Sequence, residues 1–175
     1  MKKQLLTLIA ILLTTGAFAQ LEVNNCLVSM DGITGTDFSN KNDTVTVLFE
    51  PAEFFWKITL TNNLKKDISI VWDKSSFINN GKASRIIFGT TSRLTKDNPI
   101  QNEEVPSGSY ISRKIFPLDN LMSESLFPTI NKRTIKQRFE KDGIPDKRKI
   151  VIALLIGDEL KKFEYNFSIV PKLKK

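Results

Sequence analysis

The sequence predicts an all-β protein, a β-sandwich of about seven to nine short strands. Apolar and polar residues alternate with a period of two in several segments, which is typical of strands buried on one face. Residues that favour turns separate these segments at short intervals. A continuous apolar run near the C-terminus is typical of a strand covered on both faces.

The strands and their turns are predicted in chain order from these patterns. Alternation marks the segments 44–49, 56–61, 68–73 and 163–170, and the continuous apolar run is 150–156. Further strands are predicted around 21–29, 86–88 and 110–116. Turns are predicted at 63–66, 79–81, 106–108 and 157–158, where Asn, Gly, Pro, Lys and Asp occur. The turn at 63–66 is expected to return the chain along 67–73.

Three longer segments do not follow the strand pattern. Residues 89–105, with Asn98-Pro99 and the pair Glu103-Glu104, are expected to form an exposed loop. Residues 118–129 are expected to be irregular, with a candidate helical turn at 120–126. The segment 133–141 fits either a short helix or a ninth strand, and periodicity alone leaves both open.

The first 19 residues have the pattern of a secretory signal peptide, with Lys2 and Lys3, the apolar block 5–13 and then Ala17-Phe18-Ala19. The apolar block is shorter than the roughly 20 residues that a transmembrane helix needs. A lipid anchor would need a cysteine directly after the cleavage site, whereas Cys26 comes later. We therefore expect a single soluble domain, residues 20–175, exported to the periplasm or the exterior without a lipid anchor.

Cys26 is the only cysteine, so no disulfide can form within the chain. Its apolar neighbours Leu27 and Val28 favour a small buried hydrophobic side chain. The alternative is a reactive thiol, or one that pairs between chains.

Positive charge is concentrated in one segment. Removal of Lys2 and Lys3 would lower the formal charge from +7 to +5, and residues 132–149, with eight basic and three acidic residues, carry all of this excess. We take Lys132, Arg133, Lys136 and Arg138 as a candidate anion-binding surface, for an anionic membrane, a lipopolysaccharide phosphate or an acidic glycan. The alternative is an ordinary solvated segment. Nucleic acid is not expected as a partner, because export removes it from reach.

Common catalytic patterns are missing from the sequence. The chain has no histidine, which excludes Ser-His and Cys-His nucleophile pairs, and it has no Ser-x-x-Lys motif. Glu103-Glu104 and Asp158-Glu159 are adjacent pairs whose members point to opposite faces of an extended chain. No catalytic residue, cofactor, cofactor-binding residue or metal ligand is predicted.

Two short patterns near the N-terminus are similar to a calcium-binding loop and to a glycosylation site. The loop 31–43 contains Gly and several Asp and Asn oxygens of the kind that calcium prefers, but its spacing fails the EF-hand pattern. Asp43-Thr44-Val45 is similar to an O-glycosylation signature of some Gram-negative envelopes, so Thr44 is a candidate modification site.

Three stretches, WKITLTNNLKKDISIVWDKSSFINNGKASRIIF, VPSGSYISRKIFP and IVIALLIGDELKKFEYNFSIV, carry a family resemblance. Across residues 45–170 the chain resembles small exported or lipid-anchored immunoglobulin-like proteins of the Gram-negative envelope. The resemblance implies an immunoglobulin-like sandwich with Trp56 or Trp72 packed at its centre, and it implies no catalytic residues.

These observations lead to a first hypothesis and two alternatives. The first is a non-enzymatic exported module for binding or envelope assembly, whose partner, an envelope protein or glycan, the sequence leaves open. The second is an envelope glycan or peptide hydrolase whose carboxylates converge only in the fold. The third is a membrane-surface protein that uses the basic segment 132–149.

Overall fold

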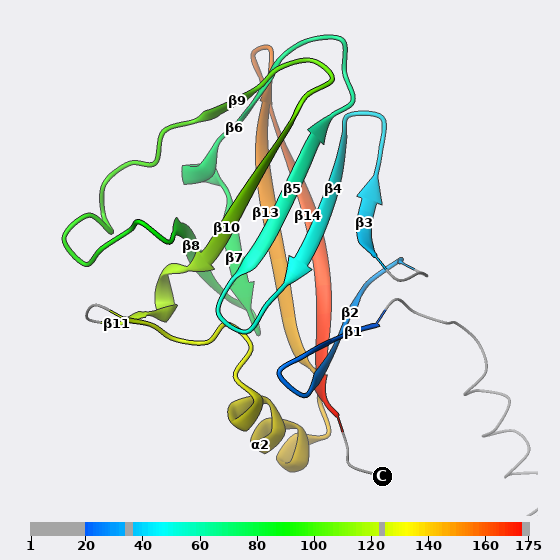
Figure 1. Ribbon diagram of the computed structural model, residues 1–175, viewed down its shortest axis with the longest axis vertical. Coiled ribbons are helices and arrows are strands. Elements are labelled where there is room, and N and C mark those ends of the chain that lie inside the picture. The colour runs from blue at the N-terminus through cyan, green and yellow to red at the C-terminus, as the bar shows by residue number, and fades with distance from the viewer. Residues whose placement is uncertain (1–19, 34–36, 123–124, 173–175) are drawn as a thin grey trace, which may run out of the picture.

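The computed structural model describes residues 20–33, 37–122 and 125–172, so the predicted signal peptide, residues 1–19, lies outside the described part. Strands dominate the described residues, which confirms the all-β prediction (Figure 1). The strands are β1 (Gln20–Val23), β2 (Cys26–Met30), β3 (Phe38–Lys41), β4 (Val45–Pro51), β5 (Trp56–Asn62), β6 (Ile68–Ile70), β7 (Ser76–Asn79), β8 (Lys82–Phe88), β9 (Glu103–Val105), β10 (Tyr110–Pro117), β11 (Leu121–Met122), β12 (Ser125–Leu126), β13 (Asp146–Ile156) and β14 (Glu159–Pro171). The helical elements are η1 (Trp72–Lys74), η2 (Leu118–Asn120) and α2 (Lys132–Asp142).

Twelve of these strands form one antiparallel sheet. Its strands follow the order β1-β2-β14-β13-β7-β8-β10-β5-β4-β3, while β6 pairs with both β13 and β9. Strands β11 and β12 form a separate small pair. The strand number exceeds the prediction because several strands, such as β7 and β9, are too short for alternation to be recognised.

The sheet curls so that β4 and β5 face β14 across the core (Figure 1). The ring of Phe49 on β4 lies 4.8 Å from that of Tyr165 and 5.2 Å from that of Phe167, measured between centroids. Trp56 on β5 packs edge-on against Phe167 at 4.6 Å. Inward-facing aromatic residues from strands distant in sequence therefore fill the interior, and their burial is the main stabilising contribution.

Strand β13 is the central strand that the apolar run predicts. Its residues Ile150, Val151, Ile152, Ala153 and Leu154 are all buried, because β14 lies on one side of the strand and β7 and β6 on the other, with side chains covering both faces. The hairpin turn between β13 and β14 contains Gly157 at φ 63°, a conformation that glycine adopts without strain.

The segment after β5 does not return beside it as predicted. Instead, β6 pairs with β13 and β9, so the chain crosses to another part of the sheet. Buried Asn62 explains the crossing: its side-chain amide donates to the carbonyls of Lys66 at 2.8 Å and Val105 at 3.0 Å. The alternation at 68–73 also ends early, because Trp72 begins a short 3-10 helix.

The segment 133–141, which the sequence leaves as helix or strand, lies in helix α2. The Asn131 side chain accepts a hydrogen bond from the N–H of Thr134 at the N-terminus, and Gly143 ends the helix at φ 67°. Ile135 anchors the helix to the core. The candidate helical turn at 120–126 is wrong for the described residues, because β11 and β12 pair there as a short hairpin and the 3-10 turn η2 precedes them.

No helix in the described part of the chain is long and apolar enough to cross a membrane.

Candidate functional site

The predicted anion-binding residues separate into two groups on α2. Lys132, Arg133 and Lys136 are exposed, and Lys136 lies 3.5 Å from the carboxylate of Glu140. Arg138 instead points toward β13 and contacts the carboxylate of Asp146 at 2.7 Å. Three of the four residues therefore lie on the outer surface, whereas the fourth, Arg138, is half-buried against β13.

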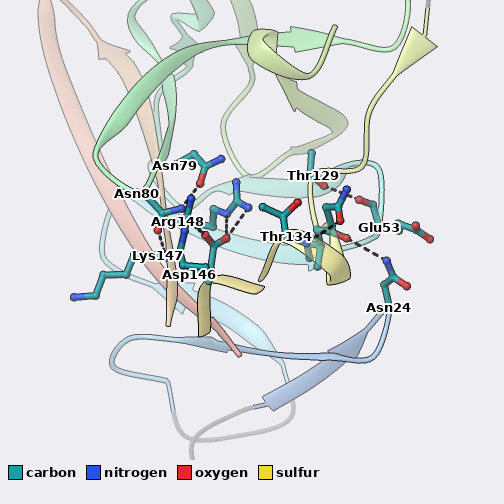
Figure 2. A network of polar contacts seen from close by, with 12 residues as sticks. Asn24, Glu53, Asn79, Asn80, Thr129, Thr134, Asp146, Lys147 and Arg148 are labelled. Atoms are coloured by element: carbon teal, nitrogen blue, oxygen red, sulfur yellow. Dashed lines mark hydrogen bonds and ion pairs between the residues drawn. The ribbon is translucent and has the colours of Figure 1, made fainter. Parts of the chain in front are cut away.

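Asp146 is the centre of a buried polar network at the end of the sheet next to α2 (Figure 2). One carboxylate oxygen accepts from Arg138 and from the side-chain amide of Asn80. The other accepts from Nε of Arg148 at 2.8 Å and from its terminal nitrogen at 2.6 Å. The network joins α2, β13 and the turn between β7 and β8.

The network includes two guanidinium groups and one carboxylate, so its local charge is +1. Burial lowers the pKa of Arg148, and the adjacent Asp146 carboxylate opposes that shift. A small polar cavity of about 210 Å³ lies beside it. Its lining side chains are largely bonded within the protein: Asn120 donates to Phe127, and Asn131 caps α2. We interpret the network as a connection that positions α2.

Hydrogen bonds of the segment before α2 stabilise the same end of the fold (Figure 2). The Thr129 hydroxyl donates to the carbonyl of Glu53 at 3.0 Å, and the N–H of Ile130 donates to the same carbonyl at 2.9 Å. Asn24, in the turn between β1 and β2, donates to the carbonyl of Ile130 at 3.2 Å. Segments far apart in the sequence therefore close this end of the fold together.

A larger hollow, of about 770 Å³, lies beside β10. Trp72, Phe88 and Phe116 provide apolar and aromatic surface. The walls include Gly89, Thr90, Ile100, Gln101, Asn102, Glu103, Ser112, Arg113 and Lys114. We call this the β9–β10 hollow, because residues of both strands line it. Apolar lining with a few polar groups is the usual composition of a binding site.

The charged groups of the β9–β10 hollow are engaged with their neighbours. The carboxylate of Glu103 accepts from the indole N–H of Trp72 at 3.0 Å and pairs through its other oxygen with Arg113. The ammonium of Lys114 lies 4.6 Å from the centroid of the Phe55 ring, which is a cation–π distance. These contacts hold the walls in place. Of the two positive charges, Glu103 neutralises that of Arg113 but not that of Lys114.

The loop 89–102, which forms the outer wall, is tied to the body of the protein. Arg85 on β8 pairs with Asp73 at 2.5 Å and donates to the carbonyls of Lys96 at 2.9 Å and Asn98 at 2.5 Å. Asp73 also accepts from the N–H of Ile100 at 3.2 Å. The hollow therefore has a fixed wall before any partner arrives.

Sequence reasoning did not identify the β9–β10 hollow. Trp72, Glu103 and Arg113 are far apart in the sequence, and Glu103 was expected in a solvated loop, whereas it lies half-buried on β9. One signal was present: the segment 89–105 is longer than the other segments without a strand pattern, and such long loops often have a function.

The remaining predicted sites lie in turns or partly outside the described residues. Thr44 is half-buried in the turn between β3 and β4, and its N–H donates to the Asn42 side chain at 2.8 Å. Residues 34–36 of the candidate calcium loop 31–43 lie outside the described residues. Within the described residues, no group of three or more Asp, Glu, Cys or His side chains is arranged to hold a metal ion.

The carboxylate pairs considered in the sequence lie on strands and turns. Glu103 faces the hollow while Glu104 is exposed, as expected for neighbours on a strand. Asp158 and Glu159 are exposed at the turn between β13 and β14. Comparison with known proteins finds no family model, no curated protein and no solved structure that matches the chain.

Proposed function

We propose that this chain is a non-enzymatic binding module of the bacterial cell envelope, exported to the periplasm or the exterior after removal of residues 1–19. The observation that carries the proposal is the β9–β10 hollow, whose volume of about 770 Å³ exceeds that of the cavity beside Asp146, about 210 Å³. It combines aromatic surface with a preformed wall, two features that favour binding without costly rearrangement.

The chemistry of the hollow supports binding rather than catalysis. Its carboxylate, Glu103, already accepts from Trp72 and pairs with Arg113. A general base must instead reach a proton of the substrate within hydrogen-bond distance. The Glu103 contacts would have to break before the group could act on a substrate, whereas binding uses them as they are.

The curled sheet is, in this proposal, an immunoglobulin-like sandwich. Support comes from Trp56, which is buried where β5 faces β14 and packs against Phe77 and Phe167. Trp72 is also buried but belongs to the wall of the hollow. Trp56 is therefore the better match to the central tryptophan of such sandwiches, and the proposed kinship with immunoglobulin-like envelope proteins gains support from it.

A variant that fills the hollow tests the proposal. Gly89 lies at its edge, and a Cβ added there would meet only the ring of Phe116, at 3.7 Å and 3.9 Å, which are ordinary contacts. Gly89→Leu should therefore fold normally and occupy part of the hollow. Gln137→Leu, which adds a leucine at an exposed position of α2, is the matched control.

The measurement is crosslinking and pull-down of the exported protein from its own envelope. We expect the wild type and Gln137→Leu to capture the same partner, and Gly89→Leu to lose it. Equal capture by all three proteins would reject the hollow as the binding site.

A second candidate function is supported by the outer surface of α2. Lys132, Arg133 and Lys136 are exposed, and only Lys136 has a carboxylate within ion-pair distance among the described residues. Such a surface fits contact with an anionic membrane, to which each basic side chain contributes about 1 kcal/mol. Arg138 does not belong to it, because it pairs with Asp146.

A further inference from the structure

We infer that the β9–β10 hollow binds an extended acidic polypeptide segment, which adds as a strand along the open edge of β10. The inference rests on the proposed function and names the class of partner. Addition of a strand to an open sheet edge is a general mode of peptide recognition, in which main-chain hydrogen bonds provide affinity and side-chain pockets provide specificity.

Strand β10 has an open edge at the hollow. It pairs with β5 from Tyr110 to Ile115, but its pairing with β8 begins only at Ile115 and ends at Pro117. The first half of β10 therefore has a strand partner on one side only. Unpaired main-chain groups of this kind are the part of a sheet that another chain can use.

The register shows which main-chain groups point to the open edge. The N–H of Asn62 donates to the carbonyl of Ser109 at 2.9 Å, so the main chain of Ser109 points toward β5. Main-chain direction alternates along an antiparallel strand, so Tyr110 and Ser112 point away from β5. The Ser112 carbonyl accepts from the Arg113 side chain at 2.8 Å, a contact that agrees with this direction.

Strand β9 lines the opposite wall of the hollow. Its strand partner among the described elements is β6, and its residue Glu103 lines the hollow opposite residues of β10. The turn 106–109 connects the two strands, which then diverge, as Figure 1 shows. Beyond the turn, Glu103 and Arg113 bridge the strands through long side chains.

The lining indicates the chemistry of the inserted strand. Side chains alternate between the two faces of a strand, so one set would meet Trp72, Phe88 and Phe116 and should be apolar or aromatic. Glu103 and Arg113 neutralise each other, while Lys114 has no carboxylate partner among the described residues. An Asp or Glu on the inserted strand would complement Lys114.

Random heptapeptides displayed on phage and selected against residues 20–175 provide the probe. We expect selected peptides to alternate apolar and polar residues and to contain Asp or Glu. With a selected peptide bound, amide hydrogen exchange of Tyr110 and Ser112 should slow by about tenfold or more, because their N–H groups gain acceptors.

Two variants at one position separate main-chain pairing from side-chain contact. Ser112→Pro removes the N–H at the open edge and should weaken binding by about tenfold or more, since proline is tolerated at sheet edges. Ser112→Ala removes only the hydroxyl, which accepts from Thr59 at 3.2 Å, and should bind as the wild type does. If Ser112→Pro fails to fold, the exchange of Ser112 in the wild type still decides the question.

Two results would overturn the inference. One is that no peptide is enriched over a control selection; the other is that selected peptides protect amides elsewhere and leave Tyr110 and Ser112 unchanged. Either result leaves the proposed function standing if Gly89→Leu still loses the envelope partner. Loss of the proposed function would instead show as equal capture by Gly89→Leu and the wild type.

Discussion

The guanidinium of Arg148 donates twice to one oxygen of the Asp146 carboxylate, at 2.8 Å and 2.6 Å, two residues earlier on the same strand. Both side chains are buried, with 4% of Asp146 and 8% of Arg148 exposed. Arg138 and Asn80 satisfy the other carboxylate oxygen. A buried charge with its hydrogen bonds complete is tolerated, whereas removal of one partner leaves an uncompensated charge.

We therefore expect Asp146→Ala to lower the free energy of unfolding by about 3 to 5 kcal/mol, because the buried guanidinium of Arg148 loses its counterion. Urea unfolding followed by tryptophan fluorescence measures this change. Arg138→Gln is the control, and we expect a loss of about 1 kcal/mol, since the Arg138 side chain is 40% exposed. A loss below about 1 kcal/mol for Asp146→Ala would contradict a role of the network in stability.

The alkaline stability of the protein should depend on Tyr165. Its hydroxyl is buried without a hydrogen-bond partner among the described residues, and burial raises the pKa of Tyr165 above the ordinary value of 10.0. Above about pH 10 the unfolded chain releases this proton more readily than the folded one, so stability falls with rising pH, by up to about 1.4 kcal/mol per pH unit. Below pH 10 both the folded and the unfolded chain keep the Tyr165 proton, so the full stability is present.

Tyr165→Phe should remove the fall in the free energy of unfolding that ionisation of Tyr165 causes above pH 10. At pH 7 its free energy of unfolding should equal that of the wild type or exceed it by about 1 kcal/mol. The measurement is urea unfolding at several pH values between 8 and 11. Tyr110→Phe, at a side chain 68% exposed, serves as the control and should follow the wild type. Parallel pH profiles for the wild type and Tyr165→Phe would refute the assignment.

Cys26 should behave as a buried apolar side chain and not as a reactive thiol. It is fully buried, and burial raises the pKa of its thiol, an effect that nearby Lys132 only partly opposes. Because the thiolate is the reactive form, we expect a thiol reagent to modify native Cys26 at least about 100-fold more slowly than the urea-unfolded chain. An exposed cysteine introduced by Gln137→Cys should react at once. Fast labelling of Cys26 in native buffer would revive the reactive-thiol interpretation.

If α2 contacts an anionic membrane, replacing Lys132, Arg133 and Lys136 together by glutamine should weaken binding to anionic liposomes. We expect a loss of about two orders of magnitude at low salt, and little difference at high salt. Liposome co-sedimentation measures it.

The control for the α2 variant replaces Lys65, Lys66 and Lys74 by glutamine; these lysines are exposed elsewhere on the protein. This variant has the same net charge as the α2 variant. An equal loss for the two variants would show that net charge, and not α2, attracts the protein to the membrane. Equal binding of the wild type to neutral and anionic liposomes would reject this function altogether.

Much of the strand pattern was predictable, because alternation needs only five or six residues to show itself. Strand β5 and the β13–β14 hairpin are where the sequence places them. Short strands such as β7 were missed, since four residues do not define a period. The helix at α2 was ambiguous because Ile135 is its only fully buried side chain.

The candidate sites were harder to predict than the strands. The basic residues of α2 were identified by charge alone, but the inward contact of Arg138 depends on how the helix packs against β13. The β9–β10 hollow is lined by four segments, around residues 72, 88–90, 100–103 and 112–116, which come together only in the folded sheet. Periodicity describes each segment separately and contains no information about which segments pack against each other in the fold.

The most direct test of the account is photo-crosslinking from two glutamine positions in the native envelope. A photoreactive amino acid replaces either Gln101, in the wall of the hollow, or Gln137, exposed on α2. We predict that a discrete crosslinked species forms from position 101 and disappears when Gly89→Leu is added, while position 137 gives none. Crosslinks of equal yield from both positions, or a species at 101 that persists with Gly89→Leu, would contradict the claim that the β9–β10 hollow is the binding site.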